Sequence, residues 1–434
     1  MQTSSLAPVM PAQHSAGPTD PSHDDLLRRG ILFTDIHRSV ALLLVGLFLG
    51  AIYGIPLSQA YLEHREGEDS PLLDLFRRKP SAENLRQFEK DIELASYAKA
   101  YTQPRLQGLL TRFGRVGNKL ALVGERGFLY YKPGVLHVVG PGFLEPDTLR
   151  TRERDALDAG NEAIVADPRP AIVSFHAALA ARGIRLILVP VPDKAALAGE
   201  PLHGRSTPQR RPENPDFERL LSELRGRGVA VFDPGQGLVS DSNLYLAQDT
   251  HWTPRYMERT ARGLAHYITS VVSLPAADGE LAWRDVEQPI ARVGDLVDML
   301  KLSENQTVFL PQPVVVHQVR DQRDEPWESD EKADVLLLGD SFSNIFSLEG
   351  MGWGSAAGLG PQLSLALQRP VDVIAQNDAG AFATRRALAR ELASGADRLA
   401  GKRVVVWEFA SRELSAGDWK AIDWSNPAAN QDRP

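Results

Sequence analysis

The order of apolar and polar positions divides the chain into an apolar N-terminal segment and a long region in which helices and strands alternate. Val40–Leu57 is uncharged and long enough to cross a bilayer. From about residue 165, short apolar runs such as Ile184–Val191 and Val335–Leu338 alternate with helical segments such as Ala171–Arg182 and Pro254–Val272. Continuous apolar runs with abrupt polar ends are typical of buried parallel strands. The pattern therefore predicts an α/β domain of three layers, a mainly parallel sheet with helices on both faces.

Three other stretches carry local signals. A helix is expected to open at Pro80-Ser81, with apolar residues at helical spacing from Leu85 onward. Residues 119–123 and 128–131 flank a glycine-bearing turn and predict a β-hairpin, whose aromatics Phe128, Tyr130 and Tyr131 could line a sugar groove or belong to the core. Residues 273–330 lack a clean period and are expected to be an irregular insertion.

The apolar segment suggests how the chain is organised around a membrane. Arg28, Arg29 and Arg38 precede it, and their excess predicts a cytoplasmic N-terminus, with the large domain outside the cytoplasm of a bacterial cell. A cleaved signal peptide, with a site near Ser58-Gln59-Ala60, is the alternative to an anchor. We expect a disordered cytoplasmic tail, a transmembrane anchor, a juxtamembrane helical segment, an enzymatic domain and a disordered C-terminal tail at residues 1–37, 38–58, 59–114, 115–424 and 425–434.

Composition narrows the function classes. The 434 residues are 43% hydrophobic and 24% charged, ordinary values for a chain with a core. The net charge of −8 gives no indication of nucleic-acid binding. No cysteine is present, which excludes disulfides, cysteine nucleophiles and thiolate metal sites. We expect neither a cofactor nor a metal.

Two stretches carry candidate chemistry. The strand at Val335–Leu338 leads directly into Gly339-Asp340-Ser341, which places Ser341 at the carboxyl edge of the sheet, where α/β folds bind ligands. Serine needs a base, and Asp249 and His251 supply a carboxylate and an imidazole. Their spacing of two would point both side chains the same way in an extended segment, before a helix capped by Thr253 and Pro254. A structural turn and a solvated capped loop are the alternatives.

These stretches together resemble the alginate O-acetyltransferases of the AlgJ/AlgX group, which are SGNH-hydrolase-like. The resemblance rests on Asp249-Thr250-His251-Trp252 and Gly339-Asp340-Ser341-Phe342-Ser343. It is extended by Pro190–Lys194, Gly294-Asp295-Leu296 and Val404–Glu408 and covers about residues 115 to 415. Ordinary SGNH hydrolases place the serine first, whereas here the order is Asp, His, Ser. Triad geometry does not depend on chain order.

The resemblance implies a periplasmic polysaccharide O-acetyltransferase with Asp249, His251 and Ser341 as catalytic residues. It also implies three kinds of partner: a polysaccharide acceptor such as alginate, a polytopic membrane-bound O-acyltransferase that supplies acetyl groups, and other polymer export proteins. A carbohydrate acetylesterase using the same triad and a non-catalytic polysaccharide-binding subunit are the competing functions.

Further polar residues are candidates for supporting roles. The backbone N–H of Ser341 and Asn377, just past the end of a strand, are candidate oxyanion donors. Arg385 and Arg386 could hold a uronate carboxylate or form a solvated helix face. Asp193 and Lys194 could line the rim of the site or form a loop salt bridge, and the glycines around Trp353 could admit substrate or form a flexible loop.

Overall fold

The computed structural model describes residues 37–67, 69–72, 77, 79, 81–160, 162–203, 211–275, 283–377 and 380–426. They form two compact units that divide between Tyr101 and Thr102. The tails predicted at residues 1–37 and 425–434 lie almost entirely outside the described residues. The other predicted domain boundaries stay predictions.

The first unit is helical. One described helix, Arg38–Glu66, is long and apolar enough to cross a membrane by length and composition. It consists of α2 (Arg38–Leu49), the π-helical turn η1 (Gly50–Gly54) and α3 (Ile55–Glu66). Helix α5 (Ala82–Ala95) begins where predicted, because the Ser81 side chain accepts the N–H of Asn84, whereas Pro80 lies outside the described residues. Helix α6 (Tyr97–Gly114) follows and runs across the division between the units.

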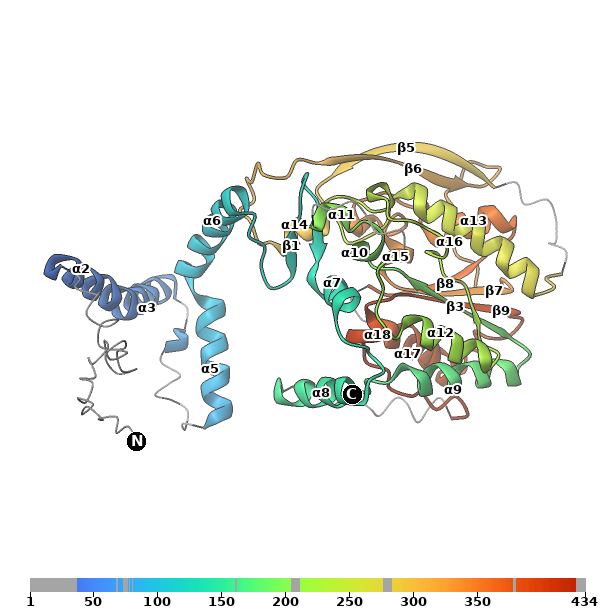
Figure 1. Cartoon of the computed structure of the whole chain (residues 1–434), viewed down its shortest axis with the longest axis horizontal. Helices are drawn as coiled ribbons and strands as arrows, with labels where there is room; N and C mark the ends of the chain where they lie inside the picture. The colour runs from blue at the N-terminus through green and yellow to red at the C-terminus, as the bar shows by residue number, and fades with distance from the viewer. Residues whose placement is uncertain are drawn as a thin grey trace, which may run out of the picture. The chain divides into compact units, whose positions relative to one another are not determined.

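The second unit is built on a parallel five-stranded sheet of order β4-β3-β9-β7-β8 (Figure 1). Its strands are β3 (Arg185–Val191), β4 (Ala230–Val231), β7 (Val335–Gly339), β8 (Asp372–Ala375) and β9 (Val404–Ala410). Strand β9 lies at the centre with β7 beside it, and both are buried along their whole length, which explains their apolar runs. The predicted three-layer α/β/α fold is confirmed.

Alternate residues of each strand enter two separate cores. On β7, Val335 and Leu337 face the core built with α13 and α16, whereas Leu336 and Leu338 face the core built with α9, α12 and α17. Figure 1 shows these two sets of helices on opposite sides of the sheet. The helices are α9 (Pro168–Ala181), α12 (Phe217–Gly226), α13 (Pro254–Val271), α16 (Leu359–Leu367) and α17 (Gly380–Ala393).

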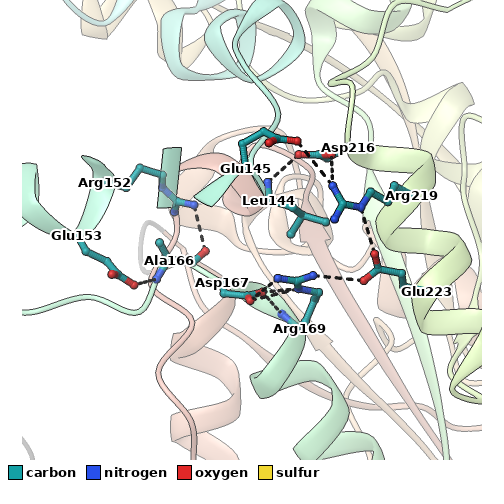
Figure 2. A network of polar contacts seen from close by, with 10 residues as sticks. All are labelled: Leu144, Glu145, Arg152, Glu153, Ala166, Asp167, Arg169, Asp216, Arg219 and Glu223. Atoms are coloured by element: carbon teal, nitrogen blue, oxygen red, sulfur yellow. Dashed lines mark hydrogen bonds and ion pairs between the residues drawn. The ribbon is translucent and has the colours of Figure 1, made fainter. Parts of the chain in front are cut away.

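A network of ion pairs connects the start of α9 with α12 (Figure 2). Arg169 of α9 contacts Asp167 at 2.8 Å and Glu223 of α12 at 3.5 Å. Arg219 of α12 contacts the same Glu223 at 3.2 Å and Asp216 at 3.3 Å. Each of these arginines is therefore matched by carboxylates.

The segment 273–330, expected to be irregular, contains a long antiparallel ribbon instead. Strands β5 (Arg284–Arg292) and β6 (Gln312–Arg320) pair over nine residues. The prediction was wrong because β5 is mostly exposed and its half-buried face has only Val286 and Ile290 among polar residues, so the alternation that indicates a strand is weak. The predicted hairpin near residue 125 is confirmed, with β1 (Ala121–Val123) antiparallel to β2 (Leu129–Tyr131).

The remaining elements are mostly short. They are α7 (Lys132–Val139), α8 (Pro146–Asp158), α10 (Lys194–Leu197), α11 (Glu200–His203), η2 (Ser242–Leu244), α14 (Asp295–Met299), α15 (Ser341–Asn344), η3 (Glu349–Met351) and α18 (Glu413–Ala416).

Candidate active site

Ser341 lies at the carboxyl edge of the sheet, where it is the first residue of the single turn of α15 that follows β7. Asp340 caps this turn, because its Oδ1 accepts the N–H of Phe342 at 2.7 Å. Gly339 leaves room for the turn, since a Cβ there would lie 2.2 Å from the Oγ of Ser343. The strand, the glycine and the capping aspartate together fix the position of the serine hydroxyl.

Asp249 and His251 lie in a compact turn rather than in the extended segment that we expected. The turn is closed by a bridge between Tyr245 and Trp252 and by the N–H of Leu246 donating to the carbonyl of His251. Within the turn, the N–H of His251 donates to Oδ1 of Asp249 at 3.2 Å. The two side chains meet because the backbone bends. As predicted, the following helix is capped by Thr253 and begins at Pro254.

The turn and the serine edge meet in one hydrogen-bonded series. Oδ1 of Asp249 lies 2.6 Å from Nδ1 of His251, and Nε2 of His251 lies 2.8 Å from Oγ of Ser341. With Asp249 ionised, Nδ1 carries the proton and Nε2 can accept the serine hydroxyl. The indole Nε1 of Trp252 donates to the carbonyl of Phe342 at 3.1 Å and so holds the two segments together.

Asp249 is only 1% exposed and is held by donors from several segments. Its Oδ2 accepts the backbone N–H of Asp295 at 3.1 Å and the indole N–H of Trp353 at 3.0 Å. Gly294 permits this approach, because a Cβ there would lie 2.3 Å from the carbonyl of Gln248. The glycine-rich loop around Trp353 thus buries that side chain against Asp249.

These contacts set the protonation states. Burial opposes ionisation of Asp249, but the hydrogen bond and charge of His251, the N–H of Asp295 and the indole of Trp353 outweigh it and hold the pKa of Asp249 well below its usual value. Burial likewise opposes protonation of His251, but Asp249 and, more weakly, Asp295 raise the pKa of His251. Burial and the charge of Asp249 raise the pKa of Asp295 to about 6.

The serine opens into a polar cleft of about 490 Å³. Asn377 lines this cleft, and its Oδ1 accepts Nδ2 of Asn344 at 2.9 Å, which leaves the amide N–H groups of Asn377 as donors. Arg412 lines it too, with its guanidinium 5.2 Å from the ring of Tyr131. Of the three hairpin aromatics, Tyr131 reaches the cleft and Tyr130 belongs to the core.

Arg385 does not reach the cleft, contrary to our expectation of a substrate contact. It is fully buried on the sheet-facing side of α17, with its guanidinium 4.9 Å from the ring of Trp407. Burial lowers the pKa of Arg385 to about 9. Arg386 lies 5.5 Å from the ring of Phe382 and does not line the cleft either. The prediction failed because the sequence pattern of α17 did not show which face of the helix packs on the sheet.

Two buried groups, Lys194 and Glu408, support the turns that carry the candidate residues, and residue types alone did not indicate these contacts. Lys194 is 5% exposed, and its ammonium donates to the carbonyls of Leu246, Ala247 and Asp249 at 2.6, 2.9 and 3.0 Å. It forms no loop salt bridge with Asp193, which instead faces Arg412 at 3.4 Å. Burial lowers the pKa of Lys194 to about 7, against the pull of Asp249 and Asp295.

Glu408 of β9 is the second supporting group. Its Oε2 accepts the N–H of Asp340 at 3.1 Å and the hydroxyl of Ser343 at 2.6 Å, so it holds the serine turn from below. Burial and the nearby Asp340 raise the pKa of Glu408 well above its usual value. Glu408 and Asp295 both belong to the stretches that carry the family resemblance, which was the one sequence signal for them.

A parallel sheet with a serine, a histidine and an aspartate hydrogen-bonded at its carboxyl edge is the arrangement of several serine-hydrolase-like classes, which include the SGNH-hydrolase-like proteins. The sequence model of the family described as "SGNH hydrolase-like domain, acetyltransferase AlgX" matches residues 145–411. That span is more than half of the chain and includes all three residues, and the chain belongs to this family.

The individual relatives share about a quarter of their aligned residues with this chain. The chain is 25% identical over 259 residues to a probable alginate O-acetylase AlgJ of Azotobacter vinelandii, covering 58% of this chain and 63% of the relative. It is 27% identical over 267 residues to a probable alginate O-acetylase AlgJ of Pseudomonas putida, covering 59% and 65%. The match therefore spans slightly less than two thirds of each relative. The solved O-acetyltransferase domain of Pseudomonas putida AlgJ aligns with a TM-score of 0.49 at 21% identity, over 72% of this chain and 98% of that domain.

Proposed function

We propose that this chain is a membrane-anchored periplasmic O-acetyltransferase that moves acetyl groups onto hydroxyls of an exopolysaccharide, alginate or a related polymer, through acetyl-Ser341. The observation that carries the proposal is the hydrogen-bonded series from Asp249 through His251 to Ser341 at the edge of a cleft. Membership of an acetyltransferase family and the names of the two AlgJ relatives support it.

The first half of the reaction acylates the enzyme. Nε2 of His251 takes the proton of Ser341 Oγ while Oγ attacks the acetyl carbonyl carbon of the donor. The tetrahedral intermediate collapses, the bond from the acetyl carbon to the donor oxygen breaks, and His251 returns the proton to that oxygen. Asp249 keeps the imidazole oriented and stabilises the imidazolium that forms.

The second half transfers the acetyl group. His251 takes the proton of an acceptor hydroxyl, whose oxygen attacks acetyl-Ser341, and the serine leaves with the proton from His251. The negative oxygen in both halves needs donors already in place. The N–H of Ser341, the first residue of α15, is one such donor. The side-chain N–H groups of Asn377 are the other, because the Oδ1 of Asn377 is already engaged by Asn344.

The proposed location determines the partners. Acetyl-CoA is not available outside the cytoplasm, so a polytopic membrane-bound O-acyltransferase would pass acetyl groups to Ser341. The acceptor would be a polysaccharide in transit through export proteins. The apolar helix Arg38–Glu66 supports a membrane anchor, and an anchor would keep the domain in the same membrane as such a donor.

The test uses the full-length chain in detergent with a small activated acetyl ester, with and without oligosaccharide acceptors. We expect the intact mass to rise by one acetyl group, on Ser341, and the acetyl group to appear on the sugar. Ser341→Ala should abolish both, while Ser343→Ala, a neighbouring hydroxyl in the same turn, should retain the acetyl adduct.

The competing functions predict different outcomes. Release of acetate to water alone, at a rate that no sugar acceptor changes, would identify an esterase. Acetylation of the polymer in cells that is unaffected by Ser341→Ala would identify a non-catalytic subunit.

A further inference from the structure

The exposed face of α13 carries a row of basic residues that the proposed catalytic site does not use. Arg255, Arg259, Arg262 and His266 follow one another at spacings of four, three and four, and all are exposed. Such spacings place side chains on one face of a helix. The helix contains one acid, Glu258, which is 9% exposed and is hydrogen-bonded to His317 at 2.6 Å. The exposed face of this helix therefore presents positive charge without a carboxylate of its own, in a chain whose net charge is −8.

The three arginines line a hollow of about 260 Å³. Its other wall is formed by the turn η2, including Asn243 and Leu244. Tyr256 also contributes to the lining, and its hydroxyl has no hydrogen-bond partner among the described residues. The hollow shares no lining residue with the cleft that holds Ser341.

The arginines of this hollow differ from two arginines of the helices on the opposite side of the sheet. Arg169 and Arg219 are each matched by carboxylates (Figure 2). In contrast, Arg255 and Arg259 form no ion pair with any residue that the structure describes, and Arg262 lies 3.9 Å from the already engaged Glu258. The carboxylate that lines the hollow, Asp241, accepts two hydrogen bonds from Asn243 at 2.9 Å.

The chemistry and length of the row define its ligand. A guanidinium matches the two oxygens of a carboxylate in bidentate geometry. Arg255 and Arg262 are about 10 Å apart along the helix axis, from the rise of 1.5 Å per residue, which exceeds the span of one carboxylate or phosphate. A ligand that engages the whole row must therefore repeat its charge along a chain.

We propose that the α13 hollow is a second, non-catalytic binding groove for an acidic polysaccharide, in which Arg255, Arg259 and Arg262 hold successive carboxylates of the polymer. The choice of a polysaccharide rests on the proposed function. The groove keeps a long acceptor attached while its hydroxyls visit the separate cleft. Attachment at a second site raises the local concentration of acceptor at Ser341.

The test measures binding of a purified uronic acid decamer to the full-length chain in detergent at low salt, with a neutral glucose decamer as the comparison ligand. The test variant is Arg255→Gln with Arg259→Gln, because glutamine keeps helix propensity and removes both charges. We expect uronate binding at least about fivefold weaker than for the wild type, with a smaller dependence on salt. The matched control, Arg225→Gln with Arg227→Gln, removes two exposed arginines at the end of α12 and should bind as the wild type does.

The remaining outcomes separate this proposal from the catalytic one. Turnover of a small acetyl ester should be the same in the wild type and in both double variants. If the wild type shows no such turnover, the proposed function is contradicted and the groove is judged from the binding measurements alone. Uronate binding that is unchanged in the test variant, or equal binding of the neutral decamer, overturns the groove. A test variant that loses affinity for anionic phospholipid vesicles but not for the decamer assigns the arginines to a membrane surface and also overturns it.

Discussion

Asp249 receives hydrogen bonds from three segments that are far apart in the chain. His251 lies two residues away, Asp295 lies 46 residues away and Trp353 lies 104 residues away. A carboxylate that accepts several N–H bonds stays ionised even when it is buried. In the proposed mechanism, this charge raises the pKa of His251 and selects the tautomer in which Nε2 faces Ser341.

The charge of Asp249 should be visible in the pH dependence of the rate. The neutral imidazole is the base, so activity is expected above the pKa of His251 and should be lost as the pH falls through it. That pKa is raised above 6.5 in the wild type, mainly by Asp249. Asp249→Asn should therefore move the acid limb of ester turnover to lower pH and reduce kcat about 10³- to 10⁴-fold.

Asp295→Asn is the matched variant for this measurement. It keeps the backbone N–H that Asp249 accepts and removes only a weaker negative charge 3.8 Å from Nδ1 of His251. We expect a smaller shift in the same direction with most of kcat retained. An acid limb in the Asp249→Asn profile at or above that of the wild type would contradict the assignment.

At the scale of elements, the serine turn is held by the neighbouring strand. Strands β7 and β9 pair in parallel, so the carboxyl end of β9 places Glu408 and Ala410 beside the turn that follows β7. Ala410 donates its N–H to Oδ2 of Asp340 at 2.8 Å, and Glu408 accepts from Asp340 and Ser343. The position of Ser341 thus depends on a strand that begins more than 60 residues later.

Replacing Glu408 should separate the contribution of its hydrogen bonds to stability from the contribution of its ionisation. Its raised pKa means that the folded state retains a proton that the unfolded state releases above about pH 4.5, so Glu408 lowers the free energy of unfolding progressively as the pH rises. Glu408→Gln supplies the same acceptor without that titration. It should retain ester turnover, be at least as stable as the wild type at pH 8, and lose this advantage toward pH 4.

Glu408→Ala is the contrasting variant. It leaves the N–H of Asp340 and the hydroxyl of Ser343 without their acceptor and should lower the free energy of unfolding by about 2 to 4 kcal/mol. Urea unfolding measured across pH tests both variants. If Gln and Ala were equally damaging, the ionised carboxylate would be the required form.

At the scale of the whole molecule, the candidate site and the candidate membrane segment belong to different units. The helix Arg38–Glu66 lies in the first unit, and all residues of the cleft lie in the second. Among the described residues of α2, apolar side chains such as Leu42, Leu47 and Phe48 are more than 60% exposed. The proposed membrane anchor requires an apolar helix of this length with exposed apolar side chains.

Fractionation of bacterial cells tests this assignment. The full-length chain should sediment with membranes, resist extraction by high salt and be released by detergent. A version without residues 1–66, exported by a cleavable signal, should be soluble in the periplasm. If cells that express the complete sequence instead yield a soluble periplasmic protein without the first 60 residues, the apolar segment is a cleaved signal peptide.

Local patterns in the sequence were sufficient for the parts of this protein that depend on neighbouring residues. The apolar run of β7, the glycine and serine that follow it, and the cap formed by Thr253 and Pro254 are decided within a few positions. They predicted the parallel sheet, the edge on which Ser341 lies and the start of α13. The candidate triad followed from residue types, with the family resemblance to connect them.

Tertiary structure decided the features that depend on contacts between distant segments. The face of α17 that packs on the sheet buries Arg385, and the bend between Tyr245 and Trp252 brings Asp249 to His251. The β5–β6 ribbon is recognisable mainly from its pairing, because only Val286 and Ile290 mark the half-buried face of β5. The donors to Asp249 and the support from Glu408 exist because parallel strands and loops from distant parts of the chain converge on one edge of the sheet, and residue order alone does not encode that proximity.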